Sequence, residues 1–402
     1  MNWFQTLFLE HSVANSLLII SLVIAVGLTL SKIKMGRVNL GVTWILFAGI
    51  AVGQLGLSID ATTAHFVKEF GLILFIYSIG IEVGPKFFAA FKSGGLLLNG
   101  LAAGIVLLGC LTAFVMQRLS GTEPAAMIGV LYGAVTNTPG LGAAQQAYSD
   151  LGAGSSPLFA QGYAVAYPLG VIGIILSITL LRSLFRINLE RENELYQRNA
   201  ARNGIELQRE LDAKQGPKTH QPNLFFIFIG IMLGVVLGVL PIHIPGMSVP
   251  VRIGLAGGPL IVSILLTYFG PRLHINTYTT ESANLMLRQV GISLFMAVVG
   301  IGAGQGFLQT IADGGYMWVL YGVVITMVPC LVIGAIARWL CKLSYFTIAG
   351  MISGACTDPP ALAYSNDICG GSQASIAYTT VYPLSMFLRV LAAQIMVILL
   401  CI

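Results

Sequence analysis

The sequence predicts an all-α membrane protein made of two inverted repeats, each with five transmembrane helices and one re-entrant or broken helical element. Three observations support this fold class. Of the 402 residues, 56% are hydrophobic and only 9% are charged, whereas soluble domains contain about 25% charged residues. Several apolar runs approach the roughly 20 residues needed to cross a bilayer. The two halves of the chain also share a series of motifs.

The apolar runs form two sets of five, separated by a charged segment. The first set covers residues 13–33, 40–57, 65–84, 94–118 and 159–185, and the second covers 223–241, 251–270, 285–308, 315–340 and 374–402. Between the fourth and fifth run of each set lies a shorter apolar stretch interrupted by proline, Ala125–Ala144 and Thr347–Tyr364. We therefore expect an N-terminal transmembrane repeat (1–186), a charged cytoplasmic linker (187–222) and a C-terminal transmembrane repeat (223–402).

The repeat is visible as matched residues at a nearly constant offset. At an offset of 220, five positions recur: Gly71/Gly291, Phe75/Phe295, Gly80/Gly300, Gly84/Gly304 and Phe87/Phe307. Further along, two motifs recur: Gly129-x3-Gly133-x2-Thr136 as Gly350-x3-Gly354-x2-Thr357, and Tyr163-x3-Tyr167-Pro168 as Tyr378-x3-Tyr382-Pro383. A colinear series of this length indicates an internal duplication.

Basic residues in the loops predict the orientation of the helices. Lys32, Lys34 and Arg37 lie in the first loop, and short loops rich in Lys and Arg stay in the cytoplasm, so the N-terminus is expected outside. If Ala125–Ala144 enters and returns, each repeat crosses five times and the linker stays cytoplasmic. An odd number of crossings makes the two repeats antiparallel, as in many secondary transporters.

Each interrupted stretch contains a helix break that can bind an anion. Pro139 and the pair Pro359-Pro360 follow short polar segments, and proline suits the first turn of a helix because its missing N–H is no loss there. Each break therefore starts a half-helix with free N–H groups and a positive dipole end, which suits a carboxylate. A single break is more typical of a proline kink, but two matched breaks favour a binding site. Its predicted residues are Thr136, Asn137, Thr138, Pro139, Gly140, Thr357, Asp358, Pro359, Pro360 and Ala361.

Two charged residues lie at membrane depth in the second half. Asp358 replaces Asn137 of the first copy, and a carboxylate there costs about 2.5–3.5 kcal/mol on insertion scales. It can pair with a substrate ammonium, bind a coupling cation, carry a proton, or simply cap the half-helix that begins at Pro359. Arg389 lies within the last apolar run, where Ile174 is its apolar counterpart. It can clamp a carboxylate with two hydrogen bonds, form a salt bridge with Asp358, or reach the membrane interface.

Other polar residues in the apolar runs are less specific. Tyr167 and Tyr382 share helix faces with Tyr163 and Tyr378, which fits a cavity wall or ordinary packing equally well. Glu82 is interpreted as a surface or gating charge, and Lys68-Glu69 as an interface ion pair. The GxxxG-like spacings predict close helix approach.

Four segments resemble the aspartate:alanine exchanger family of bacterial secondary transporters. They are Gly133-Ala-Val-Thr136-Asn-Thr-Pro139-Gly-Leu-Gly-Ala-Ala144, Gly354-Ala-Cys-Thr357-Asp-Pro-Pro360-Ala-Leu-Ala-Tyr364, Gly80-Ile-Glu-Val-Gly84-Pro-Lys-Phe-Phe88 and Tyr382-Pro-Leu-Ser-Met-Phe-Leu-Arg389. The resemblance covers both membrane halves. It departs from the family at 187–222, because family members usually carry a pair of cytoplasmic regulatory domains between the halves.

The resemblance implies alternating access in the bacterial inner membrane, a homodimer, and small carboxylate substrates such as aspartate with alanine, or C4-dicarboxylates such as succinate. We expect exchange, with Asp358 and Arg389 in the site, and proton- or sodium-coupled symport or export as the alternative. An ion channel would show a filter sequence, and an intramembrane enzyme would show a motif such as HExxH or GxSxG. The sequence contains neither of these motifs. No cofactor, metal or nucleic-acid partner is expected.

Overall fold

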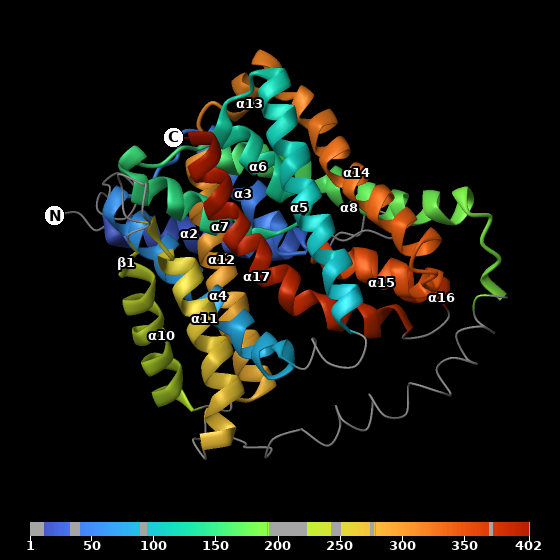
Figure 1. Ribbon diagram of the computed structural model, residues 1–402. Helices are drawn as coiled ribbons and strands as arrows, with labels where there is room; N and C mark the ends of the chain where they lie inside the picture. Colours follow the sequence, from blue (N-terminus) through green and yellow to red (C-terminus); the bar gives the residue numbers. More distant parts are fainter. Residues whose placement is uncertain are drawn as a thin grey trace.

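The computed structural model of the chain is a bundle of helices (Figure 1). It describes residues 12–32, 41–88, 95–190, 192, 223–242, 251–273, 277, 279–369 and 373–401. Most of the predicted linker, namely 191 and 193–222, lies outside the described residues, as do Lys34 and Arg37 of the first loop. All ten apolar runs contain a helix.

The helices follow the two predicted sets. In the first half they are α2 (Val13–Leu30), α3 (Thr43–Gln54), α4 (Ala61–Phe87), α5 (Gly95–Ser120), α6 (Pro124–Ala134), α7 (Thr138–Tyr148) and α8 (Leu158–Leu184), with a π-helical turn η2 (Ser149–Ala153) before α8. In the second half they are α10 (Leu224–Val239), α11 (Gly254–Phe269), α12 (Glu281–Gly304), α13 (Phe307–Thr310), α14 (Met317–Trp339), α15 (Tyr345–Ala355), α16 (Pro359–Cys369) and α17 (Gln373–Cys401).

Four short elements lie between described helices of the second half. Strands β1 (Pro241–Ile242) and β2 (Val251–Arg252) form an antiparallel pair between α10 and α11. A 3-10 turn η3 (Gly270–Leu273) follows α11, and a π-helical turn η4 (Ile311–Gly315) precedes α14. The described fold is therefore helical apart from this two-residue pair.

Seven of the described helices are long and apolar enough to cross a membrane. They are α2, α5, α8, α11 with η3, α12, α14 and α17. Helices α3 and α10 are shorter, at 12 and 16 residues, and α4 has 27 residues but carries Lys68, Glu69 and Glu82. A multi-pass membrane protein is confirmed: seven described helices meet the length and composition needed to cross a bilayer, and the ten predicted crossings stay a prediction.

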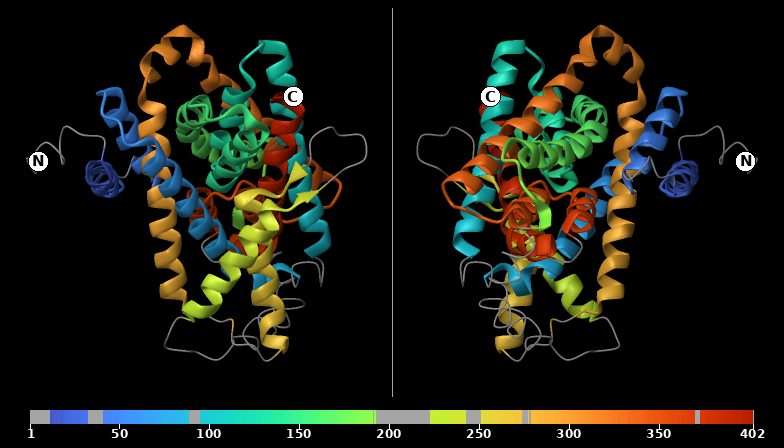
Figure 2. Two further views of the ribbon diagram at one scale, coloured as in Figure 1. Left: turned by 90° about the vertical axis from the view of Figure 1, so that its left-hand side faces the viewer. Right: turned by 90° about the vertical axis from the view of Figure 1, so that its right-hand side faces the viewer.

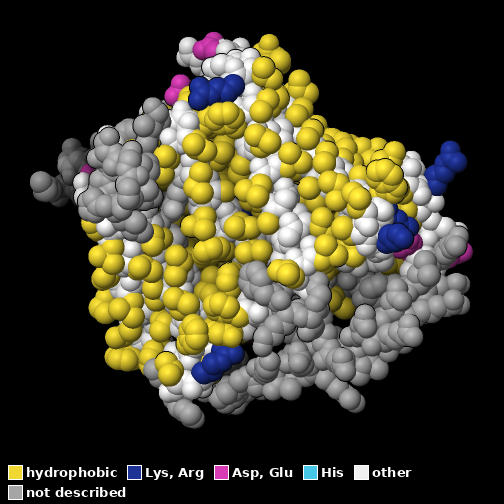
Figure 3. All heavy atoms as spheres, in the orientation of Figure 1, with side chains coloured by type: hydrophobic (Ala, Val, Ile, Leu, Met, Phe, Trp, Pro, Cys, Tyr) yellow, Lys and Arg dark blue, Asp and Glu magenta, His cyan; other side chains and the backbone are white. Residues whose placement is uncertain are grey.

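The outer surface is apolar where lipid would contact it. Leu96, Leu107 and Leu111 on α5 are 68%, 66% and 56% exposed, and similar side chains line α10 and α14. Hydrophobic side chains cover most of the described face in Figure 3, and Lys and Arg side chains lie near its borders. A chain that exposes so much apolar area needs a lipid environment.

Helices of the two halves pack on each other reciprocally. α4 packs on α11 and α12, and α12, the counterpart of α4, packs on α3 and α4. Helix α8 packs on α14 of the second half, and α17, the counterpart of α8, packs on α5 of the first half. Figure 2 shows the interleaving of early and late segments from two sides. Neither half therefore forms a separate helical body.

Glycines allow the closest of these contacts. A Cβ at Gly71 would lie 2.8 Å from the Gly291 carbonyl oxygen, and one at Gly291 would lie 2.6 Å from the Phe75 nitrogen. The GxxxG-like pairs act similarly, because a Cβ at Gly129 would lie 2.2 Å from Phe159 O and one at Gly350 would lie 2.0 Å from Ala374 O. The predicted close approach of helices at these glycines is confirmed.

Glu192 of the predicted linker packs against the second half. Glu192 is 4% exposed, forms an ion pair with Arg338 at the end of α14, and accepts a hydrogen bond of 3.0 Å from the Tyr345 N–H at the start of α15. An acidic group at a helix N-terminus is favourable. The chain leaving α8 is thus attached to the α14–α15 junction rather than solvated there.

Candidate functional site

The helix break between α6 and α7 has the same backbone form as the break between α15 and α16. Thr136 and Thr357, the corresponding residues, have φ angles of 54° and 57°, and β-branched residues rarely adopt positive φ. Pro139 lies in the first turn of α7 and Pro359 begins α16, as predicted for half-helix starts. Such strained positions persist where the surroundings fix them, often at functional sites.

The two breaks contact each other in the interior. Thr136 Oγ1 donates to Cys356 O over 3.2 Å, and Asn137 Nδ2 donates to Thr357 Oγ1 over 3.0 Å. Asn137 Oδ1 accepts from the Gly140 N–H over 2.7 Å and so caps α7. The structure therefore brings the two predicted motifs into one cluster, through contacts between residues 220 positions apart.

Tyrosines of α8 and α17 flank this cluster. The hydroxyls of Tyr163 and Thr138 share a hydrogen bond of 2.8 Å, and the rings of Tyr163 and Tyr167 are 5.3 Å apart. The rings of Tyr378 and Tyr382 are also 5.3 Å apart. Tyr163, which the sequence analysis did not assign to the site, hydrogen-bonds Thr138 directly, and the ring of Tyr167 lies beside that of Tyr163.

Asp358 is a buried carboxylate without an ion-pair partner among the described residues. Its side chain is 0% exposed. It faces the Ala361 N–H, the counterpart of the Gly140 N–H, but no hydrogen bond of ordinary geometry reaches either carboxylate oxygen. A buried charge that lacks a partner is costly, so a cation, a proton or a hydrogen-bond donor would stabilise this carboxylate.

Arg389 holds the end of α15. It is 2% exposed, and its Nε donates to Ala355 O over 2.7 Å, which stabilises the negative end of that helix. Its Nη2 has no hydrogen-bond partner, and no ion pair joins it to Asp358 in the described part of the chain. The guanidinium therefore neither reaches the membrane interface nor neutralises Asp358.

The remaining predicted residues differ in exposure. Pro139 and Gly140 are buried, Pro360 is half-buried, Ala361 is buried and Pro359 is exposed. Pro359 and Tyr382 line a cavity of about 190 Å³, together with Glu82, Val83, Arg288, Tyr378, Thr379 and Pro383. Arg288 Nη1 donates to Glu82 Oε2 there over 2.6 Å.

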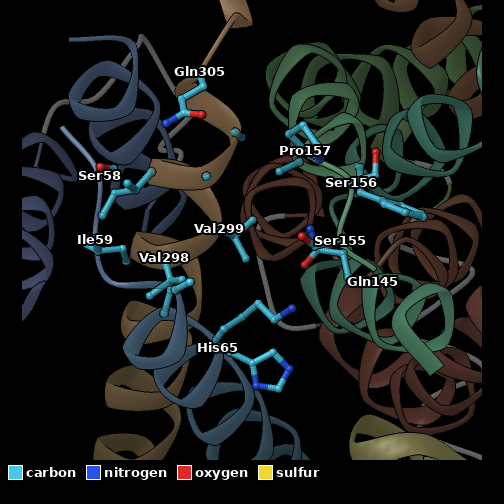
Figure 4. A pocket seen from close by; sticks show the side chains of 18 residues that line it. Ser58, Ile59, His65, Gln145, Ser155, Ser156, Pro157, Val298, Val299 and Gln305 are labelled. Carbon is cyan, nitrogen blue, oxygen red and sulfur yellow. The ribbon is translucent and has the colours of Figure 1, made fainter. Parts of the chain in front are cut away.

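A second cavity of about 360 Å³ lies where α4 begins and α12 ends. Its polar lining residues are Ser58, His65, Lys68, Gln145, Ser155, Ser156 and Gln305. Figure 4 shows Gln145, Ser155 and Ser156 across this cavity from Ile59 and Val298. None of the predicted site residues lines it, although Gln145 belongs to α7, whose first turn is in the central cluster.

Arg288 is the charged residue that sequence reasoning missed. It lies near the start of α12, where a basic residue is typical of a cytoplasmic helix end, so nothing in the sequence separated it from other loop charges. One sequence signal could have singled out Arg288: the matching position 220 residues earlier, Lys68, is also basic. Across the described residues, no group of three or more His, Cys, Asp and Glu side chains could hold a metal ion.

Comparison with known proteins identifies the family. A family model described as a predicted permease membrane region matches residues 19–183 and 226–398. The chain belongs to this permease family. Its two matched blocks coincide with the two membrane halves, and the resemblance to aspartate:alanine exchangers that the helix-break motifs indicated is confirmed.

Relatives of this permease family are named as transporters. An uncharacterized transporter of Bacteroides fragilis is 39% identical over 96% of this chain and 96% of its own length. Another, from Bacteroides thetaiotaomicron, is 37% identical over 99% of this chain and 100% of its own length. The alignment with the B. fragilis protein covers 541 residues, whereas this chain has 402, so that relative has residues without a counterpart here. Family and relatives support transport rather than catalysis.

Proposed function

We propose that this permease is a secondary transporter that moves small carboxylates across the bacterial inner membrane by alternating access, with exchange as its mode. One observation carries the proposal. Two matched helix breaks meet at Asn137 and Thr357, beside a fully buried carboxylate, Asp358, whose oxygens have no hydrogen bond of ordinary geometry in the described part of the chain. Paired discontinuous helices at membrane depth are how many transporters bind small charged substrates.

The site divides into anion-binding and cation-binding parts. The N-termini of α7 and α16 present positive dipole ends, which favour a carboxylate. The unpartnered Nη2 of Arg389 is available to a second carboxylate. Asp358 binds the substrate ammonium in an amino-acid exchanger, or a coupling ion.

The inverted arrangement of the two repeats is part of this proposal. Reciprocal packing supports it, since α4 contacts α11 and α12 contacts α3, as expected when a two-fold axis relates the halves. A central site shared by both copies can open to either side by equivalent motions. The N-terminus is then outside and the linker cytoplasmic, and a homodimer completes the assembly.

Proton- or sodium-coupled symport is the second candidate. Asp358 favours it, because a buried carboxylate without an ion-pair partner among the described residues can bind a proton or a cation between substrate cycles. In that case the carboxylate titrates or binds an ion during transport instead of pairing with a substrate ammonium.

Uptake into proteoliposomes distinguishes these modes. Labelled aspartate and labelled succinate are offered to vesicles loaded with each candidate counter-substrate or with buffer alone. We expect uptake only with a counter-substrate inside. Uptake into buffer-loaded vesicles driven by a proton or sodium gradient would establish symport instead, and no uptake of either substrate by folded protein would contradict the carboxylate assignment.

A further inference from the structure

The two cavities are related to each other by the internal duplication. The smaller cavity is lined by Glu82, Val83 and Arg288, and the larger by Gly302, Ala303 and Lys68. These are matching positions at an offset of 220: Glu82/Gly302, Val83/Ala303 and Lys68/Arg288. In the smaller cavity, Arg288 of α12 lies beside the C-terminal part of α4. In the larger cavity, Lys68 of α4 lies beside the C-terminal part of α12.

The cavities lie at opposite ends of the α4–α12 pair. Lys68 is near the start of α4 and Glu82 is near its end, and 14 residues of helix span about 21 Å at 1.5 Å per residue. The helices cross between these ends, at Gly71 and Gly291. If α4 and α12 cross the membrane as the sequence predicts, the two cavities face opposite sides.

The duplication is broken at the charged groups. In the smaller cavity, Glu82 of α4 bridges to Arg288 of α12 over 2.6 Å and both residues line the cavity. In the larger cavity the counterpart of Glu82 is Gly302, so no carboxylate crosses from α12 to Lys68. Lys68 instead lies 3.3 Å from its own neighbour Glu69, which is not part of the cavity lining. Only one of the two cavities is crossed by an ion pair.

The smaller cavity is adjacent in the chain to the central cluster of helix breaks. Tyr378, Tyr382 and Pro359 line the same small cavity, and Pro359 directly follows the buried Asp358. An anion that displaced Glu82 from Arg288 would reach the start of α16 past these tyrosines.

We propose that Arg288 is the first carboxylate contact on one side of the membrane and that Glu82 occupies it as a built-in competitor. The larger cavity beside Lys68 is the entrance on the other side, where no ion pair joins α4 to α12 in the described part of the chain. Arginine binds carboxylates through two hydrogen bonds, so a substrate carboxylate replaces Glu82 with the same chemistry. This inference rests on the proposed function, because it assigns the entry contacts of the same transport path.

The solvent exposure of the Glu82–Arg288 ion pair allows a substrate carboxylate to displace Glu82. The side chains of Arg288 and Glu82 are 29% and 47% exposed, and pairs exposed to this extent contribute little to stability. The Glu82–Arg288 pair therefore occupies the carboxylate contact but holds it only weakly. Because a weak competitor can be displaced, its removal should change apparent substrate affinity on that side only modestly.

Side-specific transport kinetics test the competitor. With Glu82→Gln, we expect the half-saturating carboxylate concentration to fall about twofold to fivefold, the range that an exposed pair supports, on one side of the membrane only. Arg288→Gln should raise it on that same side, and the matched control Lys68→Gln should raise it on the opposite side. Unchanged affinity in Glu82→Gln, or equal changes on both sides, would overturn the inference.

A second measurement does not depend on the substrate. Thr379→Cys places a thiol in the smaller cavity and Ser156→Cys places one in the larger, and labelling by a membrane-impermeant maleimide is compared with that of the parent chain, which has six cysteines. We expect the two thiols to react from opposite sides, with Glu82→Gln accelerating labelling at position 379 and leaving position 156 unchanged.

The two measurements separate failure of this inference from failure of the proposed function. If the protein transports neither aspartate nor succinate, but the labelling follows the expected pattern, the entrances stand and the substrate assignment fails. If transport occurs but both thiols react from the same side, or Glu82→Gln does not alter labelling at position 379, the entrance assignment is wrong.

Discussion

Asn137 and Asp358 occupy the same position in the two copies of the motif and differ by one charge. Asn137 uses its amide fully, donating to Thr357 Oγ1 and accepting from the Gly140 N–H. Asp358 is equally buried, yet its oxygens have no hydrogen bond of ordinary geometry. Asp358 faces the equivalent Ala361 N–H, but no hydrogen bond of ordinary geometry forms there. This incompletely bonded carboxylate supports the proposal that Asp358 is held for a ligand or an ion.

Asp358→Asn tests this interpretation at a single residue. The first copy shows that an asparagine fits the break, so we expect the protein to fold and retain its melting temperature in detergent. Uptake should fall by at least about tenfold, which corresponds to about 1.4 kcal/mol. The reverse change, Asn137→Asp, serves as the control for the fold, because it loses the donor to Thr357 and should lower the melting temperature. Normal uptake by Asp358→Asn would remove the carboxylate from the mechanism.

Gly140 sets the distance between α7 and Tyr132. A Cβ at this position would lie 2.1 Å from Tyr132 Cε1 and 2.2 Å from Cδ1, and the Tyr132 hydroxyl donates to Arg389 O over 2.9 Å. We expect Gly140→Ala to destabilise the protein by about 1–3 kcal/mol, as overpacked cores do, and to lower uptake by shifting Arg389.

Thermal unfolding in detergent measures this effect, with Gly100→Ala as the matched control. A Cβ at Gly100 would meet nothing within 4 Å, so this variant should unfold like the parent chain. Equal melting temperatures for the two variants would show that Tyr132 moves aside freely.

At the scale of elements, the contact between α4 and α12 holds the two halves together. The pair Gly71 and Gly291 brings the backbones into direct contact, and in lipid such packing of small residues drives helix association. Because the two entrance cavities lie on either side of this crossing, its geometry also sets the separation of the entrances.

Gly291→Ala should weaken this crossing. Its Cβ would lie 2.6 Å from the backbone nitrogen of Phe75, and backbone cannot move aside as a side chain can. We expect a loss of about 1–3 kcal/mol, seen as a lower melting temperature. Gly302→Ala on the same helix is the control for stability, since a Cβ there would meet nothing within 4 Å. A Gly291→Ala protein as stable as Gly302→Ala would show that the crossing adapts without cost.

At the scale of the whole molecule, the two halves depend on each other for packing. α12 packs on α3 and α4, α4 packs on α11, and α17 packs on α5. Glu192 adds a polar attachment at the end of the first half, through Arg338 and the Tyr345 N–H. Each half alone would leave its glycine-lined contact faces without their partners.

Splitting the chain within 193–222 tests this dependence. The two halves expressed together should associate and co-purify, because the break leaves Glu192 and every described helix intact. Either half expressed alone should aggregate or be degraded. A single half that is monodisperse in detergent and resists proteolysis would contradict the reciprocal packing.

Features that are set by residues close together in the sequence were predictable from it. Apolar runs gave all ten helices, and the prolines gave the breaks before α7 and α16, because each proline constrains its own turn. The duplication predicted that the two breaks correspond. Seven of the described helices are long and apolar enough to cross a membrane, and the ten predicted crossings stay a prediction.

The sequence by itself determined a helical membrane protein with two related halves, each with a proline-started half-helix, because hydrophobicity and backbone restriction act locally along the chain. Only the tertiary structure decided the contacts of the charged residues. Arg389 reaches Ala355 O across 34 residues and Arg288 reaches Glu82 across 206. Such pairs depend on which helices pack side by side, and no local pattern encodes that choice.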